Sequence, residues 1–305
     1  MIKTKHLFIF TLLTGSLLTA ACSYLPWQNA TNTPVNLSNE WQPLLTNNLN
    51  DWEIWMGVPH SSVTGLPKGT LQADNLNVHG DPKDAMGLNN DIKNVFSIIE
   101  EDNQPVLSIT GEIYGGISTK ASFENYHLSF QVKWGDKKWA PRLTALRDSG
   151  LLFHCQGEHG AFWKVWKLCQ EFQVQETDLG DYIPLGNHTG KLTGKIRSRK
   201  IPNSKRPVYD PNGALGNVGY ASAFPEVDKP HGQWNTLELF AVGDRAVFVV
   251  NNTVVMVVEQ LADIAGNPLN AGQLQFQSEG AELFYRDIKI KALPSMPKEY
   301  EQYFN

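Results

Sequence analysis

Short segments of alternating apolar and polar residues dominate this chain, and few segments show the spacing typical of helices. The clearest alternation places Leu128, Phe130, Val132 and Trp134 on one side of a single strand. Gly, Pro and Asn separate such segments, as turns between strands require. The segments predicted to form strands are residues 106–110, 126–134, 151–155, 171–175, 236–242, 246–250, 253–258, 273–277 and 283–291.

Many short strands with frequent turn residues favour a sandwich of two sheets. Asn251 and Asn252 predict a two-residue hairpin turn, because Asn tolerates positive φ. Helices are expected only at residues 261–264 and 297–304. Two irregular segments, residues 57–94 and 202–232, interrupt the strand pattern, and insertions of this length are often functional loops. The sequence therefore predicts an all-β sandwich of two antiparallel sheets with long loop insertions.

One polar face stands out, in residues 171–181. Phe172 and Val174 are expected to face the core, which turns Glu171, Gln173 and Gln175 to the other side of the strand. A row of carboxylate and amide groups suits a polyhydroxyl ligand or a cation. A half-buried strand that ends in an acidic turn would give the same pattern.

The acidic turn that follows contains Glu176, Asp178 and Asp181 around Gly180. Oxygen ligands of this kind suit Ca²⁺, and Mn²⁺ becomes an option if a histidine joins them. The alternative is that these carboxylates only cap the turn. A divalent cation, Ca²⁺ or Mn²⁺, is therefore an expected cofactor rather than a required one.

The N-terminus has the features of an export signal. Lys3 and Lys5 precede an apolar run at residues 7–18, and small residues lead to Cys22. This pattern resembles a bacterial lipobox, which implies cleavage before Cys22 and acylation of its thiol. Ordinary secretory cleavage is the alternative. We expect a lipoprotein of the outer membrane, facing the periplasm or the cell surface, with a signal peptide at 1–21, a flexible tether at 22–40, the folded domain at 41–293 and a tail at 294–305.

Net charge argues against nucleic acid as a partner, because the 305-residue chain carries a formal charge of −5. Residues 191–206 are locally basic and are interpreted as a solvated strand and loop. The sequence does not address the oligomeric state.

Two cysteines remain besides Cys22. Cys155 is expected to share a face with Leu151 and Phe153, whereas Cys169 shares a face with Glu171. Neighbouring strands bring opposite faces together only through a bulge or a change of register. An oxidising periplasm permits a disulfide, but the alternation predicts that these two cysteines do not pair.

Several separated segments together resemble one family. They include Asp-Ser-Gly-Leu-Leu-Phe-His at 148–154, Glu-Phe-Gln-Val-Gln-Glu-Thr-Asp-Leu-Gly-Asp at 171–181 and Gly-Gln-Leu-Gln-Phe-Gln-Ser-Glu-Gly at 272–280, with further segments at 44–52, 126–133, 233–236 and 285–288. In this order they are similar to the 3-keto-disaccharide hydrolase domain family over residues 40–293. His154 and Asp148 depart from that pattern, which usually has Arg and Asn at these places.

The resemblance implies a concanavalin-like jelly roll with a ligand on its concave face. It also implies a substrate class, namely glycosides whose sugar is oxidised at carbon 3. Such a ketone acidifies the hydrogen at carbon 2, so one base and one electrophile suffice to expel the glycosidic oxygen. His154 and Glu171 are the candidate bases.

Ordinary glycoside hydrolysis needs two carboxyl groups beside the scissile bond. Gln173 and Gln175 occupy the next positions after Glu171 on the same face, and amides neither donate a proton as acids nor attack as nucleophiles. Double displacement from this strand alone is therefore disfavoured. Glu279, on a distant strand, remains an alternative partner carboxylate.

The carbohydrate ligand is expected to contact residues that combine polar groups with aromatic rings. Exposed tryptophans stack on sugar rings, although most tryptophans belong to a core. A non-catalytic carbohydrate-binding lipoprotein is the alternative to an enzyme, and a structural envelope protein is a third interpretation. The expected ligand contacts are Gln173, Gln175, Trp163, Trp166, Glu279 and His159.

Overall fold

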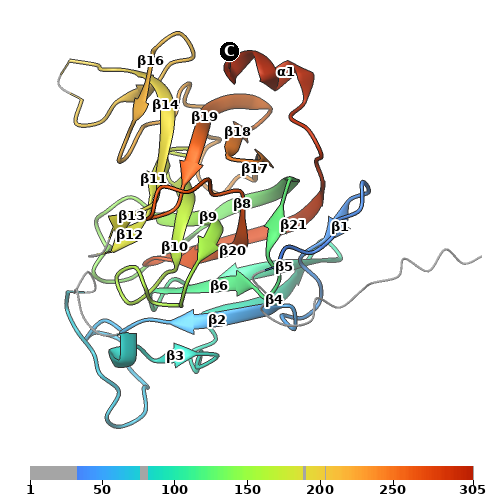
Figure 1. The fold of residues 1–305 in the computed structure, drawn as a ribbon. Helices are drawn as coiled ribbons and strands as arrows, with labels where there is room; N and C mark the ends of the chain where they lie inside the picture. Colours follow the sequence, from blue (N-terminus) through green and yellow to red (C-terminus); the bar gives the residue numbers. More distant parts are fainter. Residues whose placement is uncertain (1–32, 76–81, 188–189, 203, 305) are drawn as a thin grey trace, which may run out of the picture.

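The computed structural model describes residues 33–75, 82–187, 190–202 and 204–304 (Figure 1). Two antiparallel sheets pack face to face, and the described chain is almost entirely strand and loop. The expected all-β jelly-roll sandwich with long insertions is confirmed. The N-terminal segment with the predicted signal peptide and Cys22 lies outside the described residues.

The first sheet has eleven strands and forms one layer of the sandwich. Its strands in spatial order are β15 (Val208–Tyr209), β14 (Thr193–Arg199), β19 (Thr253–Ala262), β18 (Arg245–Val250), β17 (Asn235–Val242), β8 (Tyr126–Lys138), β21 (Ala281–Ala292), β5 (Gln104–Ile109) and β4 (Phe96–Glu101), with β1 (Gln42–Pro43) on β21 and β16 (Ala214–Asn217) on β14.

The second sheet has eight strands and forms the other layer. Its order is β11 (Tyr182–Pro184), β10 (Leu168–Gln175), β9 (Asp148–Gln156), β20 (Ala271–Ser278), β6 (Gly115–Thr119), β2 (Trp52–Met56) and β3 (Gly87–Leu88), with β7 (Phe123–Glu124) on β20. A separate hairpin pairs β12 (Gly186–Asn187) with β13 (Gly190–Lys191).

The core lies between the two sheets, where large aromatic side chains from both layers meet. Phe172 of β10 stacks on Phe248 of β18 with ring centroids 4.3 Å apart. Phe130 of β8 makes an edge contact with Phe276 of β20 at 5.5 Å. All four rings are fully buried. Burial of such rings is the main contribution to the stability of the fold, at roughly 1.5–3 kcal/mol for each side chain.

All nine predicted strands are present, because their alternation matches the buried and exposed sides of the sheets. The hairpin turn at Asn251 and Asn252 has φ values of 48° and 66°, as expected. The helix predicted at residues 261–264 is wrong: β19 continues to Ala262, since Leu261 is fully buried and Ala262 pairs with Thr193. The tail does form helical turns, α1 (Lys298–Glu301) and η2 (Gln302–Phe304).

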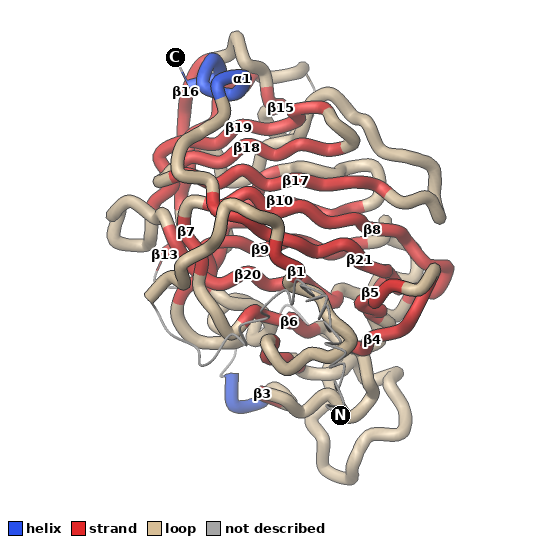
Figure 2. The backbone as a smooth tube through the Cα atoms, turned by 90° about the vertical axis from the view of Figure 1, so that its right-hand side faces the viewer, coloured by secondary structure: helices blue, strands red, loops and turns tan. Residues whose placement is uncertain are grey.

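Both chain ends of the described domain lie against the sandwich. The backbone of Val35 donates to Ser122, so the last residues of the expected tether already contact the domain. Figure 2 shows α1 at the opposite end of the sandwich from β3 and the short helix η1 (Pro82–Asp84). Among the described residues no helix has the length and apolar character needed to cross a membrane.

Candidate functional site

The side of the eight-stranded sheet that faces away from the core carries an unusual set of polar groups, and we call it the cleft face. Alternation along β10 places Phe172 and Val174 in the core, so Glu171 and Gln173 point to the cleft face, as predicted. On β20 the same alternation turns Gln275 outward. Amide and carboxyl groups of β10 and β20, the two strands that flank β9, thereby lie on one surface.

A single guanidinium gathers the carboxylates at one end of this face. Arg142 Nη2 lies 2.5 Å from Asp148 Oδ2, and Arg142 Nη1 lies 3.3 Å from Glu279 Oε1. Gln175 Nε2 donates to the same Asp148 oxygen at 2.6 Å. Burial raises the pKa of Asp148 to about 6, although Arg142 and Gln175 favour its ionised form. The result is a fixed cation held between two carboxylates.

Glu171 lies deep in the cleft face, only 3% exposed. Burial, and then the negative charges of Asp148 and Asp181, raise the pKa of its carboxyl group well above the ordinary value. The neighbouring Gly150 has no side chain, and a Cβ there would collide with Gln277 Oε1 and Glu171 Oε1. Glycine therefore lets these two side chains meet over β9.

A cavity of about 310 Å³ opens beside Arg142 and Glu279. Tyr114, Arg142, Trp163 and Glu279 line one part of it, and Asp74, Asn75 and Pro141 complete the wall. Residues 74 and 75 belong to the insertion at 57–94, so this loop walls the cavity, as its length suggested. The volume is at the lower end of ordinary ligand sites.

Glu279 faces this cavity and is almost fully buried. Burial and the nearby Asp148 raise the pKa of Glu279, while Arg142 opposes the rise. No nearby cation of the described chain opposes the rise in the pKa of Glu171. The pKa of both carboxyl groups is therefore raised, and Glu279 differs from Glu171 in having a guanidinium beside it that opposes the rise.

The two predicted sugar-stacking tryptophans have different surroundings. Trp163 is partly exposed, lines the cavity and stacks on Phe162 at 4.7 Å. Trp166 is only 1% exposed, and its Nε1 donates to the Gly115 carbonyl at 3.0 Å. A buried ring of this kind leaves no face for a sugar, so the expectation that Trp166 stacks on a ligand is wrong.

His154 does not lie on the cleft face. Its φ of 50° and the shift of register between β9 and β20 show a bulge, which turns Phe153 and His154 to the same side. The imidazole is fully buried and lies edge-on to Tyr126 of the opposite sheet at 5.8 Å. The prediction that His154 reaches the ligand as a base is therefore wrong.

Cys155 and Cys169 form a disulfide, contrary to the expectation. One irregularity explains the error: the bulge at His154 turns Cys155 to the cleft face, and the same extra residue of β9 shifts its pairing with β10 between Leu168 and Gln170. Both sulfurs then lie on the same side of the sheet. The bridge closes the loop that carries Trp163, beside Glu171.

His159 lies in the loop after β9 and contacts strand β2, away from Arg142, Asp148 and Glu279. Its Nε2 is 3.3 Å from Glu53 Oε2, and its ring stacks on Trp55 at 5.7 Å. Burial, followed by the nearby Lys167, lowers the pKa of His159. The expected ligand role of His159 therefore belongs to a second polar group, some strands away from Glu171.

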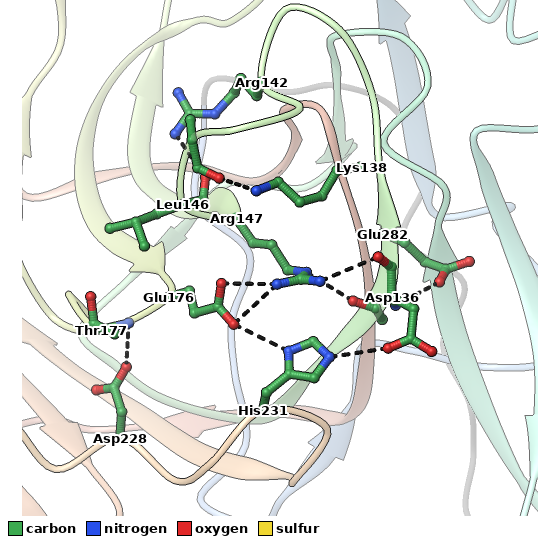
Figure 3. Close-up of polar contacts among 12 residues, drawn as sticks. Asp136, Lys138, Arg142, Leu146, Arg147, Glu176, Thr177, Asp228, His231 and Glu282 are labelled. Atoms are coloured by element: carbon green, nitrogen blue, oxygen red, sulfur yellow. Dashed lines mark hydrogen bonds and ion pairs between the residues drawn. The ribbon is translucent and has the colours of Figure 1, made fainter.

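The three predicted metal ligands do not form one group. Figure 3 shows Glu176 between Arg147 and His231, with Arg147 Nη1 at 3.0 Å and His231 Nδ1 at 3.1 Å. Asp178 and Asp181 lie instead beside Glu226 of the second insertion. The grouping of Glu176 with the other two is therefore wrong, because Arg147 and His231 engage its carboxylate.

Sequence reasoning missed Arg142, Tyr114 and Glu226 as members of this region. Arg142 lies in an irregular segment without a strand pattern, and Glu226 lies in a long insertion, so no local periodicity indicated where their side chains point. Asp148 was noted only as a departure from the family pattern. Asp148 pairs directly with Gln175 in the β9–β10 register, and this pairing is the feature that would have placed Asp148 on the cleft face.

Known structures show partial similarity to this chain. A Parabacteroides distasonis protein with a provisional glycosyl hydrolase assignment is 19% identical, with a TM-score of 0.46, covering 84% of this chain and 100% of its own. A carbohydrate-binding module from Bacillus subtilis is 13% identical, with a TM-score of 0.39, covering 65% of this chain and 92% of its own. Similarities this distant contribute nothing to the assignment of an activity. No curated protein matches the sequence.

The family match is far more extensive and agrees with the motifs quoted above. Residues 40–291 match the family described as the 3-keto-alpha-glucoside-1,2-lyase-like domain. This span contains both sheets except the last residue of β21, and it includes Arg142, Asp148 and Glu279. The chain belongs to the family of 3-keto-alpha-glucoside-1,2-lyase-like domains.

Proposed function

We propose that this protein cleaves glycosides whose sugar carries a ketone at carbon 3. The proton at carbon 2 goes to an enzyme base, a double bond forms between carbons 1 and 2, and the bond from carbon 1 to the glycosidic oxygen breaks. The departing oxygen takes up a proton. Water can then add to the unsaturated ketone, which makes the net reaction a hydrolysis.

The observation that carries this proposal is the fixed Arg142 between Asp148 and Glu279 at the wall of the cavity. A preorganised cation stabilises the enolate that forms when carbon 2 loses its proton, and such stabilisation is often the largest catalytic contribution. The phenol of Tyr114 lines the same cavity and offers a second hydrogen-bond donor. Elimination needs this electrophile and does not need a carboxylate nucleophile.

The two buried carboxyl groups supply the proton transfers. Arg142 favours the ionised form of Glu279, so we assign the base role to Glu279. Glu171 has no ion pair with a described cation, and burial raises the pKa of its carboxyl group, which suits donation of a proton to the departing oxygen. Two carboxyl groups whose surroundings separate their protonation states are a common basis for acid and base roles.

Sugar recognition is assigned to the amides and the partly exposed indole of Trp163 around these groups. Gln173, Gln175 and Gln277 offer donors and acceptors on the cleft face, and Gln277 Oε1 is buried without a hydrogen-bond partner in the described part of the chain. A ligand hydroxyl would satisfy that oxygen. Trp163 supplies an apolar wall for the sugar ring.

The test uses p-nitrophenyl 3-keto-α-glucoside, with the unoxidised glucoside as the matched control. We expect nitrophenol release only from the keto form, with a slower rate when carbon 2 carries deuterium. Binding of both sugars without release would favour the alternative, a non-catalytic carbohydrate-binding lipoprotein. Release from the unoxidised glucoside at the same rate would contradict the elimination mechanism.

We also propose that the protein is exported and anchored to the outer membrane through acylated Cys22. The charged start, the apolar run and the small residues before Cys22 support this. Cys22→Ala should move the protein from the membrane fraction to the soluble fraction. Unchanged membrane association of that variant would refute lipidation.

A further inference from the structure

Two segments far apart in the sequence bring three carboxylates together beside the cleft face. Asp178 and Asp181 lie in the turn between β10 and β11, and Glu226 lies in the insertion at 202–232. One carboxylate oxygen from each residue lies within 4.8 Å of the others. Close like charges destabilise a fold unless a cation or protons neutralise them.

Asp181 adds an observation that a surface acidic cluster lacks. Its side chain is 0% exposed, and its Oδ1 accepts a hydrogen bond from the Ala223 amide at 2.7 Å. Its Oδ2 is buried and has no hydrogen-bond partner among the described residues. A buried carboxylate oxygen in this state is costly, and a metal ion is one of the few groups that compensates for it.

Among the described residues, Arg206 is the cation that forms an ion pair with this cluster. Arg206 Nη1 lies 3.5 Å from Asp181 Oδ2, outside ordinary hydrogen-bond length, while its guanidinium lies over the Tyr220 ring at 3.3 Å. A fourth carboxylate is also near. Asp228 Oδ2 accepts from the Thr177 amide at 3.0 Å, and its Oδ1 is buried without a hydrogen bond to the described chain. Of these four carboxylates, only that of Asp181 has an ion pair with a described residue.

We propose that Asp178, Asp181 and Glu226 bind one divalent cation of the Ca²⁺ type. Carboxylate oxygens are the ligands that hard cations prefer, and a site with three of them leaves room for water or a sugar hydroxyl. Glu226 takes the place that the sequence assigned to Glu176. The bound ion ties the second insertion to the turn that follows Gln175, next to Glu171 and Gln173.

Burial, together with neighbouring carboxylates, raises the pKa of Asp181 to about 7 and that of Glu226 to about 8. For Asp181 the Ala223 amide and Arg206 offset part of the rise. An ion bound between these carboxylates would keep them ionised.

The experiment measures cation binding in the absence of any sugar, so its failure is distinct from failure of the proposed activity. Chelator-treated protein is titrated with CaCl₂ by calorimetry and by thermal denaturation. We expect one Ca²⁺ per chain and a rise in Tm that follows the same binding curve. Asp178→Asn and Glu226→Gln should each weaken binding at least tenfold.

Glu176→Gln is the matched control, since Glu176 is in the same turn but is engaged by Arg147 and His231. It should bind Ca²⁺ with the affinity of the wild type. In chelator, Asp178→Asn should melt at or above the wild-type temperature, because it removes a repelling charge. Because Glu226 is exposed, Glu226→Gln is a second variant that should retain the fold.

Two results would overturn the proposal. One is the absence of heat and of any Tm shift at millimolar CaCl₂ and MnCl₂. The other is unchanged Ca²⁺ affinity in both Asp178→Asn and Glu226→Gln. Binding of Mn²⁺ but not Ca²⁺ would retain the three ligands and contradict the assignment of the ion.

Discussion

Arg142 Nη2 lies 2.5 Å from Asp148 Oδ2, and this contact joins an irregular loop to the cleft face of the eight-stranded sheet. Asp148 is held in turn by Gln175, its direct neighbour across the β9–β10 pair. A side chain from a segment without regular structure is thus fixed by two strand residues. The same guanidinium reaches Glu279 at the cavity wall.

Replacing Arg142 with Met should remove the electrophile while keeping much of the apolar volume. We expect kcat on a 3-keto-glucoside to fall about 100- to 1,000-fold, the range for loss of a group that stabilises an oxyanion. Stability should also fall by about 1–3 kcal/mol, since Asp148 and Glu279 lose their buried counter-ion. Steady-state kinetics and chemical denaturation measure both effects.

Arg142→Lys is the control, because it keeps the charge but loses the two-sided contact with Asp148 and Glu279. It should recover part of kcat and most of the stability. Full activity in Arg142→Met would contradict the role of this residue in the reaction.

Glu171→Gln separates proton transfer from folding. The variant keeps the shape of the buried side chain but loses the acidic proton, so turnover should fall at least about 100-fold. Its Tm should stay equal or rise, because burial already raises the pKa of this carboxyl group and disfavours its charge. Glu124→Gln, at an exposed position of β7, is the control and should change neither quantity.

Retained turnover in Glu171→Gln would exclude Glu171 as the proton donor. If turnover falls only because affinity falls, with kcat unchanged, Glu171 binds the sugar instead. Measuring kcat and KM separately distinguishes these roles.

Local alternation was sufficient to predict the strands and the orientation of residues 171–175, because one face of each strand must fill the core. Alternation was insufficient where an irregularity interrupts the two-residue period of a strand. The bulge at His154 turns that ring inward and turns Cys155 outward, which reversed two predictions from one local irregularity. Residues in irregular segments, such as Arg142, carry no period at all, so only tertiary packing determines where they point.

The disulfide offers a test of how the loop beside the cavity is held. Reduction, or the double change of Cys155 and Cys169 to Ala, opens a loop with a sequence separation of 14 residues. Loop-closure entropy predicts a loss of about 3 kcal/mol, or a fall in Tm of about 5–10 °C. Substrate KM should rise as well, since Trp163 lies in that loop.

Trp163→Ala is the matched comparison, because it removes the indole and leaves the bridge intact. It should raise KM with a smaller change in Tm. An unchanged Tm after complete reduction, checked by thiol titration, would show that the sandwich alone holds this loop.

His154 should control stability rather than catalysis. Burial lowers its pKa to about 4, and the nearby Leu269 backbone offsets part of this effect, although neither ring nitrogen has a well-formed hydrogen bond within the described chain. The ordinary pKa of 6.5 applies to the unfolded chain, so the unfolded state binds more protons between pH 4 and 6.5. Stability from this group is present above pH 6.5 and is lost as the pH falls toward 4.

His154→Phe removes the titrating group while keeping a ring against Tyr126. The wild type should lose up to about 3 kcal/mol between pH 6.5 and 4 through His154, and the variant should lose correspondingly less, as measured by denaturant unfolding across this range. Buried carboxyl groups with raised pKa values, among them Asp148, Asp181 and Glu226, oppose this slope in both proteins. The difference between His154→Phe and the wild type at each pH therefore isolates the contribution of the imidazole. At pH 8 the His154→Phe single variant should retain wild-type kcat, since the ring lies inside the sandwich. A kcat loss of a hundredfold at that pH, with the fold intact, would return His154 to the reaction.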